Sequence, residues 1–263
     1  MADWALILGA SSGFGEAIGL ELASKGFNIF GVHLDRKATL PNAERIEKEM
    51  QDKGVKTKFF NVNAADPEKI ADVLDTIKGT IGSGEQVRVM LHSIAFGTLK
   101  PLVDVANPEK QDQISKPQLD MTVDVMANSL IYWAQGVIAR DLMREHGRIY
   151  AMTSSGGTRV WPKYGAVSAA KAALESHCRQ LALELAPRTI AVNAVRAGVT
   201  DTPALRKIPG SDEMINIAKS RNPYGRLTTP QDVAKCIGAL VDPATDWLTG
   251  NTLGVDGGED VIG

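Results

Sequence analysis

A tyrosine and a lysine, Tyr164 and Lys171, stand seven positions apart in the stretch YGAVSAAK. In a helix, seven residues fall about 20° short of two turns and climb about 10.5 Å, so both side chains lie on one face. A lysine ammonium lowers the pKa of a nearby phenol, which can then donate a proton or a strong hydrogen bond to an oxygen that gains charge. The pair predicts acid catalysis in one cleft. The alternative is two unrelated residues on an alanine-rich packing helix.

A glycine-rich segment, LGASSGFGEAIG, follows the first apolar run of the chain. Glycines at such a junction end a strand in a tight turn and let the backbone approach a pyrophosphate, whose charge meets free N–H groups at the start of a helix. Two serine hydroxyls can add donors. We therefore predict a dinucleotide-binding loop, with a plain glycine-rich turn as the alternative. The residues of this predicted loop are Gly9, Ser11, Ser12, Gly13, Phe14 and Gly15.

With a nicotinamide cofactor, the spacing of the pair distinguishes two reductions. In ketone reduction, the oxygen is attached to the carbon that takes the hydride. In conjugate reduction of an enoyl thioester, the oxygen lies two carbons farther from the nicotinamide. The position one turn before Lys171 is Val167, and Tyr164 is set back by about one more turn. This retraction favours the enoyl substrate, although side-chain reach could absorb the difference.

The carboxyl ends of the second and third apolar runs should face the adenosine end of the cofactor. Asn61 and Val62 end the third run, where the amide would meet the adenine or simply form a turn. Beyond the second run, Arg36 and Lys37 suit a ribose phosphate, whereas Asp35 suits a free ribose hydroxyl. The two cations favour NADPH, and Asp35 leaves NADH open.

Apolar runs of strand length alternate with stretches of helical period along the whole chain. This alternation predicts an α/β fold, a single Rossmann-like domain over residues 1–263 with a doubly wound parallel sheet of about seven strands and helices on both faces. The predicted strands are residues 4–9, 28–33, 55–62, 87–93, 147–155, 189–198 and 251–258. The predicted helices are residues 13–26, 42–54, 66–79, 117–146, 164–186, 212–220 and 229–242.

Composition excludes several other classes of protein. The 29 basic and 31 acidic residues give no net field for nucleic acid or an anionic membrane, and no apolar run is long enough to span a bilayer. Cys178 and Cys236 fit core positions of helices, and two thiols at this spacing are neither a disulfide framework nor a metal site. The N-terminus has no basic segment before its apolar stretch, as an export signal would. We therefore expect a cytoplasmic protein that binds no metal.

The chain resembles the short-chain dehydrogenase/reductase superfamily over essentially its whole length. The glycine loop, the Tyr–Lys helix and a closing VDGG occur in that family's order. Several departures from the commonest pattern resemble one branch, the enoyl-acyl carrier protein reductases of bacterial fatty acid synthesis. Like that branch, the chain has six residues between tyrosine and lysine, LHSIAFG at 91–97 and RAGVTDT at 196–202. Met126 stands near the place of a ketoreductase relay asparagine, and Asn128 is out of register.

The resemblance implies the remaining site residues. Lys171 would anchor the nicotinamide ribose, and Phe96 and Gly97 would begin the acyl pocket. The chain is most similar to the less common, NADPH-using enoyl reductases that keep the ordinary three-glycine loop. The further cofactor contacts that it implies, at the ribose, the nicotinamide and its carboxamide, and the phosphates, are Ser93, Ile94, Ala95, Gly198, Thr200 and Thr202.

Ser154 departs from the enoyl reductase pattern. Many members of that branch carry a second tyrosine ten residues before the catalytic one, and this chain has Ser154 there. The same residue lies seventeen positions before Lys171, where ordinary superfamily members place a serine that orients the substrate. Ser154 therefore either helps to bind the substrate carbonyl or merely ends a strand.

The connection over residues 199–227 is long for a compact domain, which predicts a substrate lid. Its basic residues suit an acidic acyl carrier protein or are ordinary surface charge. Trp161 and Phe96 line an acyl channel or pack in the core. Relatives form homotetramers through the helices that match 117–146 and 164–186, so the resemblance implies a homotetramer.

Three functions follow from these residues. The first is reduction of an enoyl thioester on an acyl carrier protein by NADPH, with NADH not excluded. The second is a ketone or alcohol oxidoreductase acting on a 3-oxoacyl or other carbonyl substrate, and the third is a nucleotide-binding protein without turnover. Met126 and the HSIAFG stretch favour the first over the second. The intact Tyr–Lys pair counts against the third.

Overall fold

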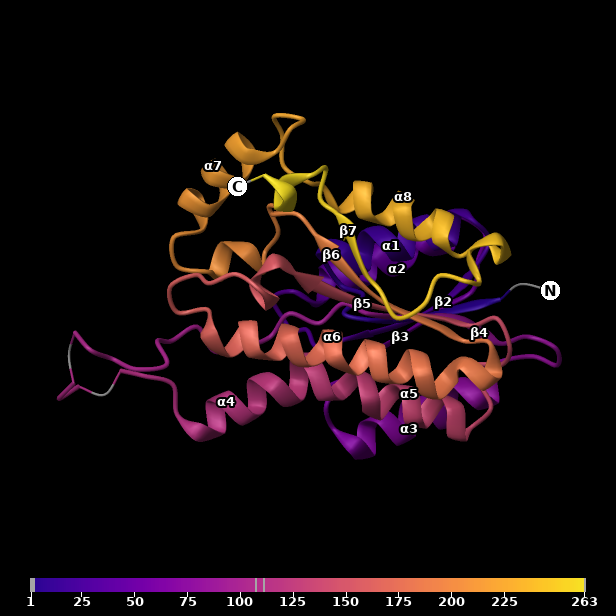
Figure 1. The fold of residues 1–263 in the computed structure, drawn as a ribbon. Helices are drawn as coiled ribbons and strands as arrows, with labels where there is room; N and C mark the ends of the chain where they lie inside the picture. The colour runs from indigo at the N-terminus through magenta and orange to yellow at the C-terminus, as the bar shows by residue number, and fades with distance from the viewer. Residues whose placement is uncertain (1–2, 107, 111, 263) are drawn as a thin grey trace.

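The computed structural model describes residues 3–106, 108–110 and 112–262 (Figure 1). Parallel strands form one seven-stranded sheet in the order β3-β2-β1-β4-β5-β6-β7, so the predicted α/β fold is confirmed. The strands are β1 (Trp4–Leu8), β2 (Asn28–His33), β3 (Thr57–Asn61), β4 (Val87–His92), β5 (Arg148–Ser154), β6 (Ala191–Ala197) and β7 (Thr252–Val255).

Helices cover both faces of the sheet (Figure 1). One layer contains α1 (Gly13–Ser24), α2 (Leu40–Gln51) and α8 (Pro230–Leu240). The opposite layer contains α3 (Pro67–Thr80), α4 (Lys116–Val123), α5 (Ser129–Ala139) and α6 (Gly165–Leu185). After β6 comes α7 (Ser211–Arg221). The short helical turns are η1 (Asp124–Asn128), η2 (Ser155–Gly157), η3 (Ala186–Arg188), η4 (Leu205–Lys207), η5 (Pro243–Thr245) and η6 (Glu259–Val261).

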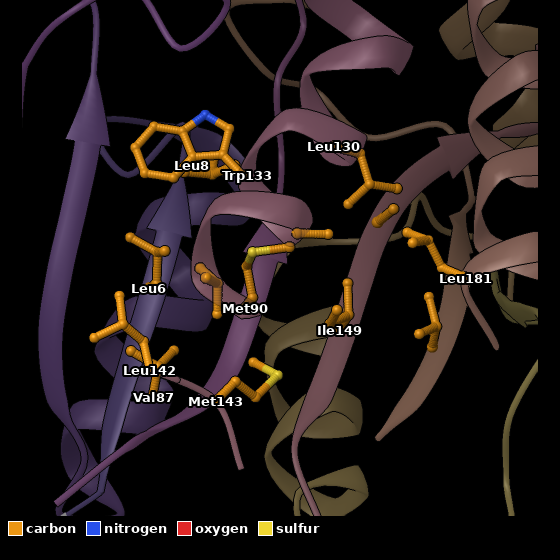
Figure 2. Packing of buried hydrophobic residues seen from close by; sticks show 14 of the residues in the cluster. Leu6, Leu8, Val87, Met90, Leu130, Trp133, Leu142, Met143, Ile149 and Leu181 are labelled. Atoms are coloured by element: carbon orange, nitrogen blue, oxygen red, sulfur yellow. The ribbon is translucent and has the colours of Figure 1, made fainter. Parts of the chain in front are cut away.

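Two apolar cores, one on each side of the sheet, hold these layers together. Successive side chains of a strand point to opposite faces, so Leu6 and Leu8 enter one core while Ile7 enters the other. Figure 2 shows Leu6 and Leu8 beside Met90 and Trp133 in the core under α5 and α6. Strands covered on both faces read as continuous apolar runs, which is why the sequence located them well.

The predicted helix over 117–146 is wrong in two respects, because it is two helices joined by a π-helical turn and it ends earlier than predicted. α4 ends at Val123, η1 carries the wider turn over Asp124–Asn128, and α5 ends at Ala139. Asp141 has a φ of 53°, which a right-handed helix excludes, so the chain leaves the helix several residues before 146. A π turn accommodates one extra residue and often lies at a functional site.

The cysteines and the apolarity of the helices can be described for the same residues. Cys178 is buried in α6 and Cys236 is half-buried in α8, and both are free thiols. Among residues 3–106, 108–110 and 112–262, no helix combines the length and apolarity that crossing a bilayer would need. The carboxyl ends of the strands lie at the edge on the left of Figure 1, where α6 begins.

Candidate active site

The glycine loop joins β1 to α1 in a conformation that larger residues could not adopt. Gly9 has a φ of 92°, and a Cβ there would lie 2.3 Å from the carbonyl oxygen of Ser93. A Cβ on Gly15 would lie 2.0 Å from the carbonyl oxygen of Gly9. The first bond of this turn runs from the N–H of Glu16 to Ser12, so the preceding N–H groups of α1 can receive a pyrophosphate. The loop therefore fits the dinucleotide that the sequence predicts.

Residues after β4 and β6 converge on this loop. The Ser93 N–H donates to the carbonyl of Leu8, which places the start of the HSIAFG stretch beside the loop. A Cβ on Gly13 would lie 3.7 Å from the methyl carbon of Thr202, so that threonine faces the loop. Thr200 is buried, and its hydroxyl donates to the carbonyl of the nearby Gly198. Further along the HSIAFG stretch, Ile94 is half-buried, whereas Ala95 is exposed.

A carboxylate stands at the adenosine end of the loop. Nδ1 of His33 donates to Asp35 over 2.9 Å. Burial alone would raise the pKa of Asp35, but hydrogen bonds from Ser11, Thr39 and His33 outweigh it and hold the pKa below its usual value. The side-chain amide of Asn61 accepts from the Asp35 N–H and donates to its carbonyl, each over 2.9 Å. An ionised, fixed carboxylate thus lies beside the phosphate loop.

These bonds change what the sequence assigned to the strand ends. Both ends of the Asn61 amide are used by the backbone of Asp35, so Asn61 holds the ribose-side loop in place instead of offering a free amide to adenine. The Val62 N–H donates to the carbonyl of His33 and continues the strand pairing. Arg36 is exposed and contributes its carbonyl to the turn before α2.

The Tyr–Lys helix meets the end of β5 residue by residue. Tyr164 immediately precedes α6, and its carbonyl accepts from the N–H of Ser168 in the first turn. Nζ of Lys171 donates to the carbonyl of Met152 over 2.7 Å. The next strand residue, Thr153, is bonded to α6 as well. A rigid strand therefore fixes the catalytic face of the helix.

Ser154 and Gly156 surround the phenol. A Cβ on Gly156 would lie 2.5 Å from Cε1 of Tyr164 and 3.2 Å from Oγ of Ser154, so only glycine leaves the two side chains together. The Ser154 hydroxyl oxygen is buried beside the phenol of Tyr164, which it stabilises electrostatically, but it makes no hydrogen bond of full geometry among the described residues. Buried polar groups are normally bonded, so a substrate oxygen between Ser154 and Tyr164 would complete this site. That arrangement favours a substrate-binding Ser154 over one that merely ends the strand.

The electrostatics of the pair differ from the expectation that Lys171 lowers the pKa of the phenol. Burial raises the pKa of Tyr164, and the Ser154 hydroxyl opposes that shift. Burial lowers the pKa of Lys171 to about 8, and it lowers the pKa of His92, with the charge of Lys171 acting in the same direction, to about 3. Near neutral pH the phenol is therefore a protonated donor, Lys171 is mostly charged and His92 is neutral.

An apolar cluster occupies the position one turn before Lys171. Val167 is buried with Met126 and Ala170, and a Cβ on Gly97 would lie 2.9 Å from a methyl carbon of Val167. The position one turn before Lys171 is therefore filled by an apolar side chain, which cannot donate a proton in place of Tyr164. The amide oxygen of Asn128 accepts from the imidazole of His177 over 3.1 Å.

Comparison with known proteins decides the family. The family described as enoyl-(acyl carrier protein) reductase matches residues 9–259. The chain belongs to this family of short-chain dehydrogenases/reductases. A 1-cyclohexenylcarbonyl-CoA reductase of Streptomyces collinus is 29% identical to this short-chain reductase, over 98% of the present chain and 86% of its own. The 3-oxoacyl-acyl-carrier-protein reductase FabG of Haemophilus influenzae is 30% identical, over 97% and 96%.

Solved structures agree on the fold. The enoyl-acyl-carrier-protein reductase (NADH) of Aquifex aeolicus superposes with a TM-score of 0.85 at 23% identity, covering 99% of the short-chain reductase described here and 97% of its own chain. A short chain dehydrogenase of Burkholderia cenocepacia in complex with NADP superposes with a TM-score of 0.84 at 25% identity, covering 98% of each chain. The short-chain reductase is thus an oxidoreductase that uses a nicotinamide cofactor.

The predicted substrate side of the short-chain reductase is only partly as expected. Phe96 is 53% exposed at the mouth of the site. The indole N–H of Trp161 donates to the carbonyl of Pro209 over 3.0 Å, and a Cβ on Gly210 would lie 3.4 Å from the ring. Trp161 therefore joins the loop before Tyr164 to the connection over 199–227, a contact for which the sequence offered no signal.

Replacing Trp161 with phenylalanine is expected to loosen this connection. The ring is retained while the bond to Pro209 is lost, and one such bond contributes about 1 kcal/mol, or about fivefold in an opening equilibrium. Limited proteolysis under native conditions should show cleavage within 199–227 about fivefold faster. The control is Trp247→Phe, whose side chain is almost fully exposed. Equal cleavage rates in the two variants would contradict the assignment.

Proposed function

We propose that this reductase saturates the carbon–carbon double bond of an enoyl thioester. The observation that supports this most is the position of Tyr164 at the start of α6, with Val167 filling the position one turn before Lys171 in an apolar cluster. In conjugate reduction, negative charge develops on the thioester oxygen, two carbons from the carbon that receives the hydride. A donor set back along the helix suits that oxygen, and donors aimed at developing charge are among the strongest contributors to catalysis.

The residues of the site divide the work as follows. The cofactor supplies the hydride when it is bound. Lys171, buried and mostly charged, is available to the hydroxyls of the nicotinamide ribose. Tyr164 donates to the enolate oxygen, and the buried hydroxyl of Ser154 beside it offers a second donor to the same oxygen. The β carbon gains the hydride, the electrons of the double bond form a new bond between the α carbon and the carbonyl carbon, and the carbonyl electrons move to the oxygen. The α carbon of this enolate then takes a proton from water, which completes the saturated thioester.

For the carrier of the acyl group, we propose an acyl carrier protein in fatty acid synthesis. Lys207 and Lys219 are exposed on the connection over 199–227 and suit an acidic partner. Arg206 does not, because it pairs with Asp201 and Asp212, each over 2.6 Å. The Streptomyces collinus relative is named for a coenzyme A thioester, so coenzyme A is the alternative carrier. We also propose a homotetramer, as the resemblance implies.

A second function, reduction of a 3-oxoacyl thioester, is favoured by a separate observation. The hydroxyl of Ser154 lies against Tyr164, and such a pair of donors also suits a ketone oxygen. The FabG relatives are as similar in sequence as the enoyl reductase relative of Nostoc, which is 30% identical over 78% of this chain. One assay separates the two functions.

That assay follows oxidation of NADH and NADPH with crotonyl-CoA and with acetoacetyl-CoA. We expect oxidation with the enoyl thioester at a kcat/KM at least about tenfold above that with the 3-oxo thioester. Oxidation with acetoacetyl-CoA alone would contradict enoyl reduction and support the second function. Cofactor binding without oxidation across a panel of enoyl and carbonyl substrates would support a nucleotide-binding protein without turnover.

For the cofactor, we infer a preference for NADH. The expectation of NADPH rested on Arg36 and Lys37, whose side chains are exposed. Asp35, in contrast, is ionised and fixed beside Ser11 of the phosphate loop. A carboxylate there accepts from ribose hydroxyls and repels a ribose phosphate.

Replacing Asp35 with serine tests this inference. The loss of a charged acceptor removes about 1.5 kcal/mol of binding free energy, so the NADH Kd should rise about tenfold. The NADPH Kd should fall, because the carboxylate no longer repels the ribose phosphate. Both constants can be measured by fluorescence of the bound dihydronicotinamide. The control is Asp52→Ser, an exposed carboxylate at the end of α2. An unchanged ratio of the two constants would overturn the preference for NADH.

A further inference from the structure

We propose that Glu175 is a positioning residue of this reductase, which holds Lys171 charged and in place for the cofactor ribose. The inference rests on the proposed function only in so far as Lys171 serves the cofactor. It concerns a residue that the sequence did not single out. Three features of the structure support it. Glu175 shares one face of α6 with Tyr164 and Lys171, its carboxylate is hydrogen-bonded to β5, and its negative charge acts on Lys171.

Glu175 lies on the same face of α6 as the catalytic pair. It follows Lys171 by four residues and Tyr164 by eleven, and eleven residues pass three turns by only about 20°. The three side chains therefore face β5 together. They do so next to three consecutive strand residues, Met152, Thr153 and Ser154.

The carboxylate of Glu175 is fixed at the strand. The hydroxyl of Thr153 donates to Oε1 of Glu175 over 2.7 Å, while the adjacent Met152 carbonyl accepts from Lys171. A Cβ on Gly157 would lie 3.1 Å from Oε1 of Glu175 and 3.6 Å from Cβ of Lys171, so the turn after β5 packs closely over both residues. The carboxylate and the ammonium are therefore anchored to adjacent residues of β5.

Burial makes Lys171 dependent on this neighbour. The side chain is only 6% exposed, and burial lowers its pKa to about 8, whereas the charge of Glu175 acts to raise it. Without that charge the pKa falls further. An ammonium is charged below its pKa, so the loss of Glu175 moves downward the pH at which Lys171 becomes neutral.

Among the described titratable groups whose charge acts to raise the pKa of Lys171, only Glu175 is an acid that is ionised near neutral pH, and the acids on neighbouring elements are engaged with other partners. His92 on β4 is neutral, because burial and Lys171 lower its pKa to about 3. Cys178 on α6 stays a thiol, because burial raises its pKa to about 12. From the elements packed against α6, Asp124 of η1 accepts from Tyr132. The acid of α4, Asp120, pairs with Lys116, and Arg196 of β6 pairs with Asp260.

The test is Glu175→Gln, which keeps an oxygen for Thr153 and the side-chain volume but removes the charge. NADH affinity is measured by fluorescence from pH 6 to pH 10, a readout that needs no acyl substrate. We expect the pH at which affinity declines to shift downward by about one unit, which is about a tenfold weaker affinity at a pH above both midpoints. Glu175→Asp should restore part of the shift, and Glu184→Gln, an exposed acid on the same helix, should cause none.

The outcomes separate this inference from the proposed function. If the pH dependence of NADH affinity is unchanged in Glu175→Gln, the assignment is overturned. It is also overturned if the affinity is lowered equally at every pH, because loss of a merely structural residue would give that result. A shifted NADH profile in a protein that fails to reduce enoyl thioesters supports Glu175 and contradicts only the proposed substrate. If Glu175→Gln does not fold, Thr153→Val releases the anchor and keeps the charge. It should shift the profile in the same direction by a smaller amount, and no shift would overturn the proposal.

Discussion

Replacing Tyr164 with phenylalanine is expected to lower kcat at least about a hundredfold while leaving the cofactor Kd within about twofold. The phenol is the donor at the developing oxyanion, and loss of one such donor typically lowers the rate by about a hundredfold or more. The ring of the variant still packs against Gly156, so the loop before α6 should keep its shape. The measurements are steady-state oxidation of the cofactor with crotonyl-CoA and cofactor binding by fluorescence.

Tyr224→Phe provides the matched control, because Tyr224 is exposed and lies outside the site. Its kcat should match that of the wild-type protein. If Tyr164→Phe retained more than about a tenth of the wild-type rate, the Tyr–Lys pair would be misassigned and another donor would have to protonate the substrate. Ser154, whose buried hydroxyl lies beside the phenol, is the residue to examine in that case.

Replacing Gly15 with alanine is expected to weaken cofactor binding about a hundredfold or more. Gly15 is already in α1, where alanine is intrinsically better by about 1 kcal/mol, so helix propensity alone predicts a gain in stability. The new methyl group would instead lie 2.0 Å from the carbonyl oxygen of Gly9 and force the phosphate loop to move. The cofactor Kd and the thermal midpoint report the two effects separately.

The matched control for this substitution is Gly79→Ala in α3. A Cβ on Gly79 meets no atom within 4 Å, so the helical gain should appear without a clash. The control should bind cofactor normally and melt at the same temperature or slightly higher. A Gly15→Ala variant with wild-type cofactor affinity would show that the loop does not hold the pyrophosphate.

The sequence predicted those parts of the molecule that depend on local periodicity. Strands buried on both faces appear as apolar runs, and the spacing of Tyr164 and Lys171 is a property of one helix. The glycine loop was predictable for the same reason, because its requirement for glycine arises at one strand–helix junction. Even the N-cap of α3 was recognisable, since Asp66 accepts from the N–H groups of Glu68 and Lys69.

The remainder depends on how separate elements meet, which one sequence does not encode in a visible pattern. Glu175 became meaningful only when β5 was placed against α6 and Thr153 reached its carboxylate. In the same way, the sequence left Asn61 as an adenine contact or a turn residue, and the structure shows its amide hydrogen-bonded to the backbone of Asp35. The π turn after α4 was missed because the apolar pattern continues through it.

The contact between β5 and α6 also sets what kind of change this site can undergo. Lys171 is fixed to the strand, but the phenol is carried on the same helix, and a helix offers side chains on one face only at steps of three or four residues, about 5 Å apart along its axis. The distance between the acid and the hydride donor can therefore change only in discrete steps of about one helical turn. A short-chain reductase can therefore change its class of substrate when the tyrosine is placed one helical turn away along α6, while the sheet and the phosphate loop stay unchanged.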